Sequence, residues 1–119
     1  MNVAVVGSRN FKELYKVDGY LNDLKQFLLL NNPDEPLHII TGGAFGVDKR
    51  AEAWCKKNTT CCQVIRPIKP TPAYFLYRNV EILTKADRVV AFWDGRSGGT
   101  KFVIDYCKAR YIPLEVVRC

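Results

Sequence analysis

The chain has 119 residues, which is enough for one compact domain and too few for two ordinary ones. Hydrophobic residues make up 48% of the sequence and charged residues 25%, which excludes a disordered tail, a collagen-like rod and a coiled coil. Lysine and arginine number 18 against 12 acidic residues, so the net charge is +6. This excess suits an anionic partner, either a phosphorylated small molecule or a nucleic acid.

The apolar runs and the cysteines indicate which classes of membrane, secreted and metal-binding protein can be excluded. The longest apolar run, at residues 27–30, has four residues, whereas about 20 are needed to cross a bilayer. The N-terminus lacks the basic and apolar pattern of a secretory signal, so we expect a cytoplasmic protein with no membrane partner. Five cysteines without a C-x-x-C pair, and a single histidine, predict reduced thiols and no metal site.

Short β-rich runs alternate with helical patterns along the chain. We expect five strands, at residues 2–6, 37–40, 62–65, 88–92 and 114–117. Between them, apolar residues spaced three or four apart predict four helices. The residues expected to face inward are, helix by helix, Val17, Tyr20, Leu21, Leu24, Phe27 and Leu28; Val47, Ala51, Trp54 and Cys55; Leu76, Val80 and Leu83; and Val103, Ile104 and Cys107.

Turn residues indicate where the helices begin and end. The Asn-Asn-Pro sequence at 31–33 is expected to end the first helix. Thr71 and Pro72 are typical of a cap followed by a first-turn proline. Thr100 is expected to begin the last helix, either as its N-cap or as a phosphate ligand.

The alternation of strands and helices predicts a single Rossmann-like domain over residues 1–119. Nearly continuous apolar strands are typical of an α/β, doubly wound parallel sheet of five strands with helices on both faces. We expect the strand order 3-2-1-4-5 rather than 2-1-3-4-5. Ligands of such sheets bind beyond the carboxyl ends of the strands, where the winding reverses. That point lies between the first and fourth strands, at residues 7–9 and 93–100, with residues 41–48 beside them.

Glycines gather in these same loops. A glycine-rich loop that leads into a helix N-terminus presents free N–H groups and suits phosphate, although a tight strand-to-helix turn also favours glycine. Neither G-x-x-x-x-G-K-[ST] nor G-x-G-x-x-G is present, so the familiar nucleotide fingerprints are excluded. Seven of the eight glycines lie here: Gly7, Gly42, Gly43, Gly46, Gly95, Gly98 and Gly99.

Each polar or aromatic side chain in the loops can be interpreted in two ways, as a structural residue or as a ligand contact. Asp48 either supports the start of its helix or accepts hydrogen bonds from a ribose or a base. Ser97 and Thr100 could hold one phosphate together with the amides between them. Phe11 and Trp93 either pack in the protein or stack on a base. Three arginines are either surface residues or anion clamps: Arg9, Arg78 and Arg96.

Four ordered motifs together resemble a known family. They are GSRNF at 7–11, GGAFGVD at 42–48, RN at 78–79 and ADRVVAFWDGRSGGT at 86–100. The chain resembles the YspA-like (DUF2493) branch of the SLOG superfamily, which also contains the LOG phosphoribohydrolases and the DNA-processing protein DprA. The resemblance implies a Rossmann-like domain of bacteria and their phages that binds nucleotide-derived ligands such as ADP-ribose-like molecules, often as a homodimer.

One departure from the LOG motif bears on catalysis. LOG enzymes carry P-G-G-x-G-T-x-x-E, and its glutamate serves in cleaving the N-glycosidic bond. Val103 stands at that glutamate's position, and Asp105 lies about 200° further round the helix. A glycosidic hydrolase needs a carboxylate near the sugar, which leaves Asp94 and Asp48 as the catalytic candidates.

Three functions follow from these patterns. We expect the domain to sense or sequester a nucleotide-derived ligand, without a further cofactor and as a homo-oligomer, with Tyr74, Phe75 and Tyr77 on a face that could meet a second subunit. The alternatives are N-glycosidic hydrolysis and single-stranded DNA binding, although no alternation of basic and aromatic residues supports the latter. The expected ligand-binding residues are Gly7, Ser8, Arg9, Phe11, Gly42, Gly43, Ala44, Gly46, Asp48, Arg78, Asn79, Trp93, Asp94, Ser97, Gly98, Gly99 and Thr100.

Overall fold

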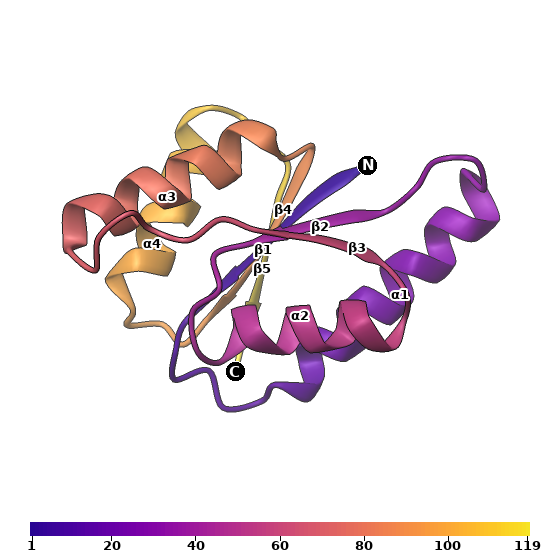
Figure 1. Cartoon of the computed structure of the whole chain (residues 1–119), viewed down its shortest axis with the longest axis horizontal. Coiled ribbons are helices and arrows are strands. Elements are labelled where there is room, and N and C mark those ends of the chain that lie inside the picture. Colours follow the sequence, from indigo (N-terminus) through magenta and orange to yellow (C-terminus); the bar gives the residue numbers. More distant parts are fainter.

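The computed structural model describes all residues from Met1 to Cys119. Strands and helices alternate strictly along the chain, as the hydrophobic patterns predict (Figure 1). In chain order the elements are β1 (Asn2–Gly7), α1 (Tyr15–Asn31), β2 (His38–Thr41), α2 (Val47–Lys57), β3 (Cys61–Val64), α3 (Pro72–Lys85), β4 (Arg88–Trp93), α4 (Gly98–Ala109) and β5 (Leu114–Arg118).

The five strands form one parallel sheet in the order β3-β2-β1-β4-β5, which confirms the predicted fold class and strand order. In the register, Val3 lies opposite both Ile39 of β2 and Arg88 of β4. Helices α1 and α2 cover one face of the sheet, and α3 and α4 cover the other (Figure 1). The winding therefore reverses between β1 and β4, and the loops that follow these strands diverge to opposite faces.

The two faces of the sheet build two separate cores. Val3 and Val5 of β1 pack with α1 and α2, whereas Ala4 and Val6 pack with α3 and α4. This alternation follows from the two-residue period of a strand. Both strands at the centre are buried through their middle four residues, so the sheet is a rigid base for the loops at its carboxyl edge.

Some inward-facing predictions are wrong at the ends of the helices. Phe27 is 55% exposed, because it lies at the edge of the stripe that contains Leu24 and Leu28. Leu76 is 38% exposed, because the first turns of α3 project past the carboxyl edge of the sheet, where Leu76 lines a cavity. In α3 the buried residues are Asn79, Ile82 and Leu83.

Two helix starts also differ in detail from the prediction. Helix α4 begins at Gly98, two residues earlier than expected, so Ser97 occupies the N-cap position and Thr100 lies inside the first turn. Pro72 is the first residue of α3 as predicted, but the Thr71 side chain makes no capping hydrogen bond. None of the four helices has the length and apolarity that a membrane-spanning helix needs.

Gly7 sets how closely the end of β1 can approach α2. A Cβ atom built on Gly7 would lie 2.5 Å from Cβ of Val47, the first residue of α2, so any side chain there would push the two elements apart. The absence of a side chain lets the loop after β1 lie against the N-terminus of α2. The β1 and β2 loops therefore form one continuous wall.

We expect Gly7→Ala to destabilise the protein by about 1–3 kcal/mol, the usual cost of overpacking a rigid core. The free energy of unfolding from urea titration measures this effect. Gly19→Ala is the matched control, since a Cβ at Gly19 meets nothing within 4 Å and alanine favours a helix interior. Equal stability of the two variants would show that the β1–α2 contact yields easily.

Candidate ligand-binding site

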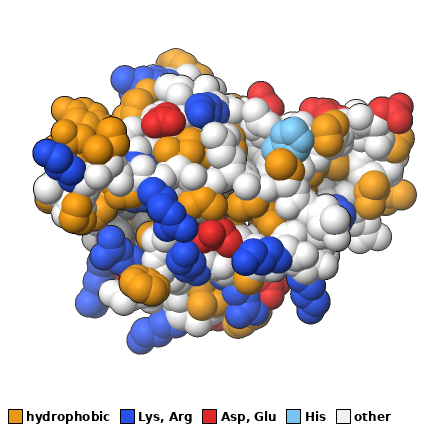
Figure 2. Space-filling model, viewed as in Figure 1, with side chains coloured by type: hydrophobic (Ala, Val, Ile, Leu, Met, Phe, Trp, Pro, Cys, Tyr) orange, Lys and Arg blue, Asp and Glu red, His pale blue; other side chains and the backbone are white.

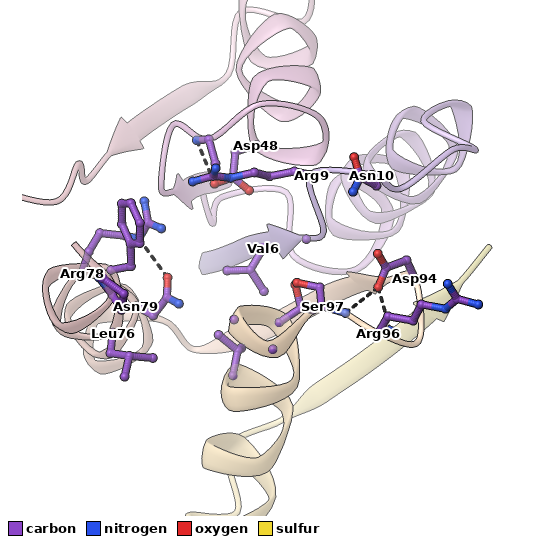
Figure 3. Close-up of a pocket in the computed structure, with 18 residues that line it drawn as sticks. Val6, Arg9, Asn10, Asp48, Leu76, Arg78, Asn79, Asp94, Arg96 and Ser97 are labelled. Atoms are coloured by element: carbon purple, nitrogen blue, oxygen red, sulfur yellow. Dashed lines mark hydrogen bonds between the residues drawn. The ribbon is translucent and has the colours of Figure 1, made fainter. Parts of the chain in front are cut away.

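A cavity of about 660 Å³ opens at the carboxyl ends of β1 and β4 (Figure 3). This size is typical of sites for small organic ligands. The face of the molecule in Figure 2 carries more Lys and Arg than Asp and Glu side chains. The cavity is lined by Val6, Gly7, Arg9, Asn10, Ala44, Asp48, Pro72, Phe75, Leu76, Arg78, Asn79, Asp94, Arg96, Ser97, Gly98, Gly99, Thr100 and Val103.

The N-terminus of α4 forms one wall of the cavity. The N–H groups of Gly98, Gly99 and Thr100 belong to the first turn, where a helix offers them no acceptor, and they donate to no other group of the protein. A Cβ atom on Gly98 or Gly99 would meet nothing within 4 Å, so the packing of the chain does not require glycine here. Gly98, Gly99 and Thr100 all line the cavity, so it opens beside three free donors and the positive end of the helix dipole.

Asp94 orders the loop that leads into α4. Its Oδ1 accepts hydrogen bonds from the backbone N–H groups of Ser97 and Arg96, both at 2.8 Å. The hydrogen bond from the Ser97 N–H, followed by that from Arg96, lowers the pKa of Asp94 below its usual value. The Ser8 hydroxyl accepts a hydrogen bond from the Asp94 N–H at 3.1 Å and so joins this loop to the end of β1. Asp94 therefore stays ionised and holds the loop in place.

Asp48 forms part of the opposite wall and is only 5% exposed. Its Oδ2 accepts hydrogen bonds from the N–H groups of Gly42 and Ala44, both at 3.2 Å. Its Oδ1 is buried without a hydrogen-bond partner, since the nearby Thr41 hydroxyl donates to the Val5 carbonyl oxygen. Asp48 thus braces the loop before α2 and keeps one acceptor free.

Burial raises the pKa of Asp48 from 3.8 to about 6. The hydrogen bonds from Ala44 and Gly42 and the positive charge of Arg78 oppose this rise and do not cancel it. A buried carboxylate with an unpaired oxygen is costly, and such groups are frequent at functional sites.

Two arginines lie beside Asp48 and close to one aromatic ring. The guanidinium carbons of Arg9 and Arg78 lie 5.6 Å and 5.7 Å from the centre of the Phe75 ring. Arg78 donates from Nη1 to the Gly42 carbonyl oxygen at 2.7 Å and from Nε to Asn79 Oδ1 at 2.9 Å. Burial lowers the pKa of Arg78; the charge of Asp48 opposes this fall, and the charge of Arg9 adds to it. Neither arginine forms an ion pair within 4.0 Å.

The structure brings eleven of the expected ligand-binding residues to the cavity and leaves six away from its lining. Phe11 is 3% exposed and packs edge-on against Phe92, so it takes the packing role rather than the stacking one. Trp93 donates from Nε1 to the Ser97 carbonyl oxygen and lies beside Arg118. The other four lie behind the lining and support it: Ser8, Gly42, Gly43 and Gly46.

Seven lining residues were not among the expected ligand-binding residues; of these, Arg96 was expected only as an anion clamp, and Val103 was noted only at the position of the LOG glutamate. Pro72, Phe75 and Leu76 lie on the same face of α3 as Asn79, with the i, i+3, i+4, i+7 spacing of one helix face. Extending the RN motif backwards along that face would have found them. Val6 and Asn10 offered no comparable signal.

Val103, which the motif resemblance aligns with the LOG glutamate, lines the cavity. Asp105 is not part of the lining; its side chain is 59% exposed and pairs with Lys101 at 2.8 Å. The carboxylates of the cavity are therefore Asp48 and Asp94, one on each wall.

No protein-family model and no curated protein matches the sequence. Two solved structures share its fold. The X-ray structure of TM1055 is 21% identical, with a TM-score of 0.67 over 95% of this chain and 71% of its own. A structure of DprA from Helicobacter pylori, described for its single-stranded DNA binding mode, is 19% identical, with a TM-score of 0.65 over 98% of this chain.

This chain spans 64% of the DprA chain, just under two thirds of its length. Likeness at this level of identity shows the fold alone. It is consistent with the SLOG-type fold that the motifs suggest, whereas membership of the YspA-like branch stays a prediction.

We expect Asp48→Asn to become more stable relative to the wild type as the pH rises. The folded state holds the Asp48 proton more tightly than the unfolded chain does, so wild-type stability falls as the pH rises from about 4 to about 7. A pKa rise of about two units corresponds to roughly 3 kcal/mol. Urea titrations of both proteins at the two ends of this range measure the change. A difference independent of pH would contradict a buried, titrating Asp48.

Asp105→Asn is the control for this measurement. It removes a carboxylate from the same protein at a surface position that is 59% exposed. The pH-dependent gain in stability over the wild type should occur in Asp48→Asn and not in Asp105→Asn.

Proposed function

We propose that the cavity binds a nucleotide-derived ligand, with a phosphate at the N-terminus of α4. The observation that carries this proposal is the first turn of α4. Three N–H groups there lack acceptors, and the space in front of Gly98 and Gly99 is open. Oriented free amides at a helix N-terminus are donors well suited to phosphate oxygens. The Asp94 carboxylate strengthens this arrangement because it holds the preceding loop rather than occupying the donors.

A ribose hydroxyl would meet the opposite wall. Asp48 Oδ1 is buried without a hydrogen-bond donor, so a ligand hydroxyl would have to shift the atoms that cover it, and it would then supply the missing donor without adding charge to the site. A phosphate in direct contact with Asp48 Oδ1 would instead be repelled by the ionised carboxylate. A base would then lie along the apolar part of α3, formed by Pro72, Phe75 and Leu76. Phosphate, sugar and base would thus have chemically matched surroundings within one cavity.

N-glycosidic hydrolysis is the second candidate, and Asp48 is the observation that favours it. A carboxyl group with a pKa of about 6 inside the cavity is suited to general acid–base chemistry near neutral pH. The α4 wall offers Val103 where LOG enzymes carry an acid, and the lowered pKa of Asp94 keeps that carboxylate ionised, so the general acid of such a reaction would be Asp48. The fold that the chain shares with DprA keeps single-stranded DNA as a third ligand to test.

A homo-oligomer stays a prediction from the sequence. Tyr77 is 68% exposed and packs edge-on against Tyr74, while Ile68 nearby in the chain is 85% exposed. Phe75 of the same segment faces the cavity. The expected aromatic face therefore divides between the ligand site and the open surface.

Gly99→Glu tests the α4 site. We expect it to weaken AMP binding more than about tenfold, since the new carboxylate would repel phosphate and fill the space in front of the amides. Thermal stability should be unchanged or higher, because glutamate favours a first helical turn more than glycine does. Isothermal titration with AMP, ADP-ribose, NAD and a short DNA oligonucleotide compares the ligands.

Gly19→Glu is the matched control, as it makes the same change at an open position of α1. Mass analysis of each mixture separates binding from hydrolysis, which would release free base and a sugar phosphate. Unchanged AMP affinity in Gly99→Glu would place the phosphate elsewhere. No binding of any nucleotide by the wild type would refute the proposal.

The affinity for AMP should fall as the pH drops through about 6, beyond the change caused by the phosphate itself. A ribose hydroxyl that donates to Asp48 binds best when Asp48 is ionised. Asp48→Asn removes this titration and leaves that of the phosphate, so the difference between the two pH profiles isolates Asp48. We expect that difference to approach about tenfold, the contribution of one hydrogen bond to a charged group. Parallel profiles would remove Asp48 from the ligand contacts.

A further inference from the structure

The cavity contains two separate groups of anion-binding donors. One is the first turn of α4, with the free N–H groups of Gly98, Gly99 and Thr100. The other is the arginine pair, Arg9 and Arg78. Figure 3 shows the arginine pair on one side of Val6, with Ser97 and Arg96 on the other. The Arg96 guanidinium points away from the arginine pair, so the cationic side chains do not form one cluster.

The arginine pair has binding capacity that the protein itself does not use. Arg9 is exposed, and its guanidinium lies over the Phe75 ring without an ion pair. Arg78 uses Nε and Nη1 to hold Asn79 and the Gly42 carbonyl, which leaves Nη2 free. The positive charge of Arg9 disfavours that of Arg78, and the nearby Asp48 carboxylate offsets this effect. An anionic group between the two arginines would also oppose this repulsion and accept hydrogen bonds from both.

Asp48 lies next to the arginine pair, on the same wall. Its free Oδ1 requires a donor close to the place where the second anion would bind. A ribose satisfies both needs when a hydroxyl and a phosphate are on neighbouring carbons. The two phosphates of a diphosphate share one bridging oxygen, so they would remain together on one wall. Anions on opposite walls require a spacer such as the sugar itself.

We propose that the ligand is a ribonucleotide with phosphates on both its 5′ and 3′ oxygens, the 5′-phosphate on α4 and the 3′-phosphate on the arginine pair. The 2′-hydroxyl would then donate to Asp48 Oδ1. This assignment rests on the proposed function, because it takes the α4 site as the first phosphate site. The same chemical unit occurs in free nucleoside 3′,5′-bisphosphates and inside an RNA strand.

Isothermal titration with adenosine 3′,5′-bisphosphate and with AMP tests the second site. We expect the wild type to bind the bisphosphate at least about tenfold more tightly than AMP, as one added charge-assisted contact implies. Arg9→Gln should bring the ratio of the two affinities close to one. Arg9 is the better position to change because Arg78 also supports the Gly42 loop. Arg110→Gln, which removes a charge stacked on Tyr106 at the other end of α4, should keep the wild-type ratio.

Two further probes complete the test. In the wild type, 2′-deoxyadenosine 3′,5′-bisphosphate should bind about tenfold more weakly than the ribonucleotide. In Asp48→Asn, the deoxyribonucleotide and the ribonucleotide should bind equally well. The trinucleotide ApApA presents both phosphates on its central residue; binding that depends on Arg9 would assign the ligand to an RNA strand, and its absence to a free nucleotide.

The outcomes separate this inference from the proposed function. An affinity ratio near one in the wild type, or a high ratio that survives Arg9→Gln, overturns the second phosphate site. If AMP still binds and Gly99→Glu abolishes that binding, the α4 site stands without the second one. If neither nucleotide binds, both proposals fail together.

Discussion

The pairing of β1 with β4 determines where every part of the candidate site lies. These two strands are neighbours in the sheet, yet their following helices cover opposite faces. The loops that follow β1 and β4 diverge directly after Gly7 and Trp93, and the cavity opens between these loops. Two hydrogen bonds hold the divergence point together, one from the Ser8 N–H to the Phe92 carbonyl and one from the Asp94 N–H to the Ser8 hydroxyl. Ser8 is itself buried, so it shapes the cavity from behind.

The two carboxylates near this point make similar hydrogen bonds but differ in how easily they ionise. Asp94 uses one oxygen to order the loop before α4 and remains easily ionised. Asp48 uses one oxygen to order the loop before α2 but loses hydration, so its ionisation is costly near neutral pH. The site therefore has one wall whose charge is constant and one whose charge follows the pH. A ligand that bridges the walls would sense both.

The sequence was sufficient to predict the order of the strands in the sheet, because the strands and the helices each have a strong hydrophobic pattern. The carboxyl-edge rule then located the cavity, since it depends only on topology. The side chains that point into it were harder to predict. Phe11 and Phe75 are both aromatic and both close to a glycine loop or the RN motif, yet Phe11 packs in the core and Phe75 lines the cavity. Which of them faces a ligand depends on how far α3 projects beyond the sheet, and no local pattern encodes that distance.

The start of α4 has a consequence for motion. Two consecutive glycines make this turn among the least helix-favouring segments that could occupy the position, and its amides are held by nothing in the free protein. Such a helix end frays more readily than the buried turns that contain Val103 and Ile104. An anion bound at the amides would suppress the fraying, and because α4 packs on β4 and β5, the effect would reach the far edge of the sheet. Occupancy of the cavity would then be readable as slower amide hydrogen exchange at residues that no ligand touches.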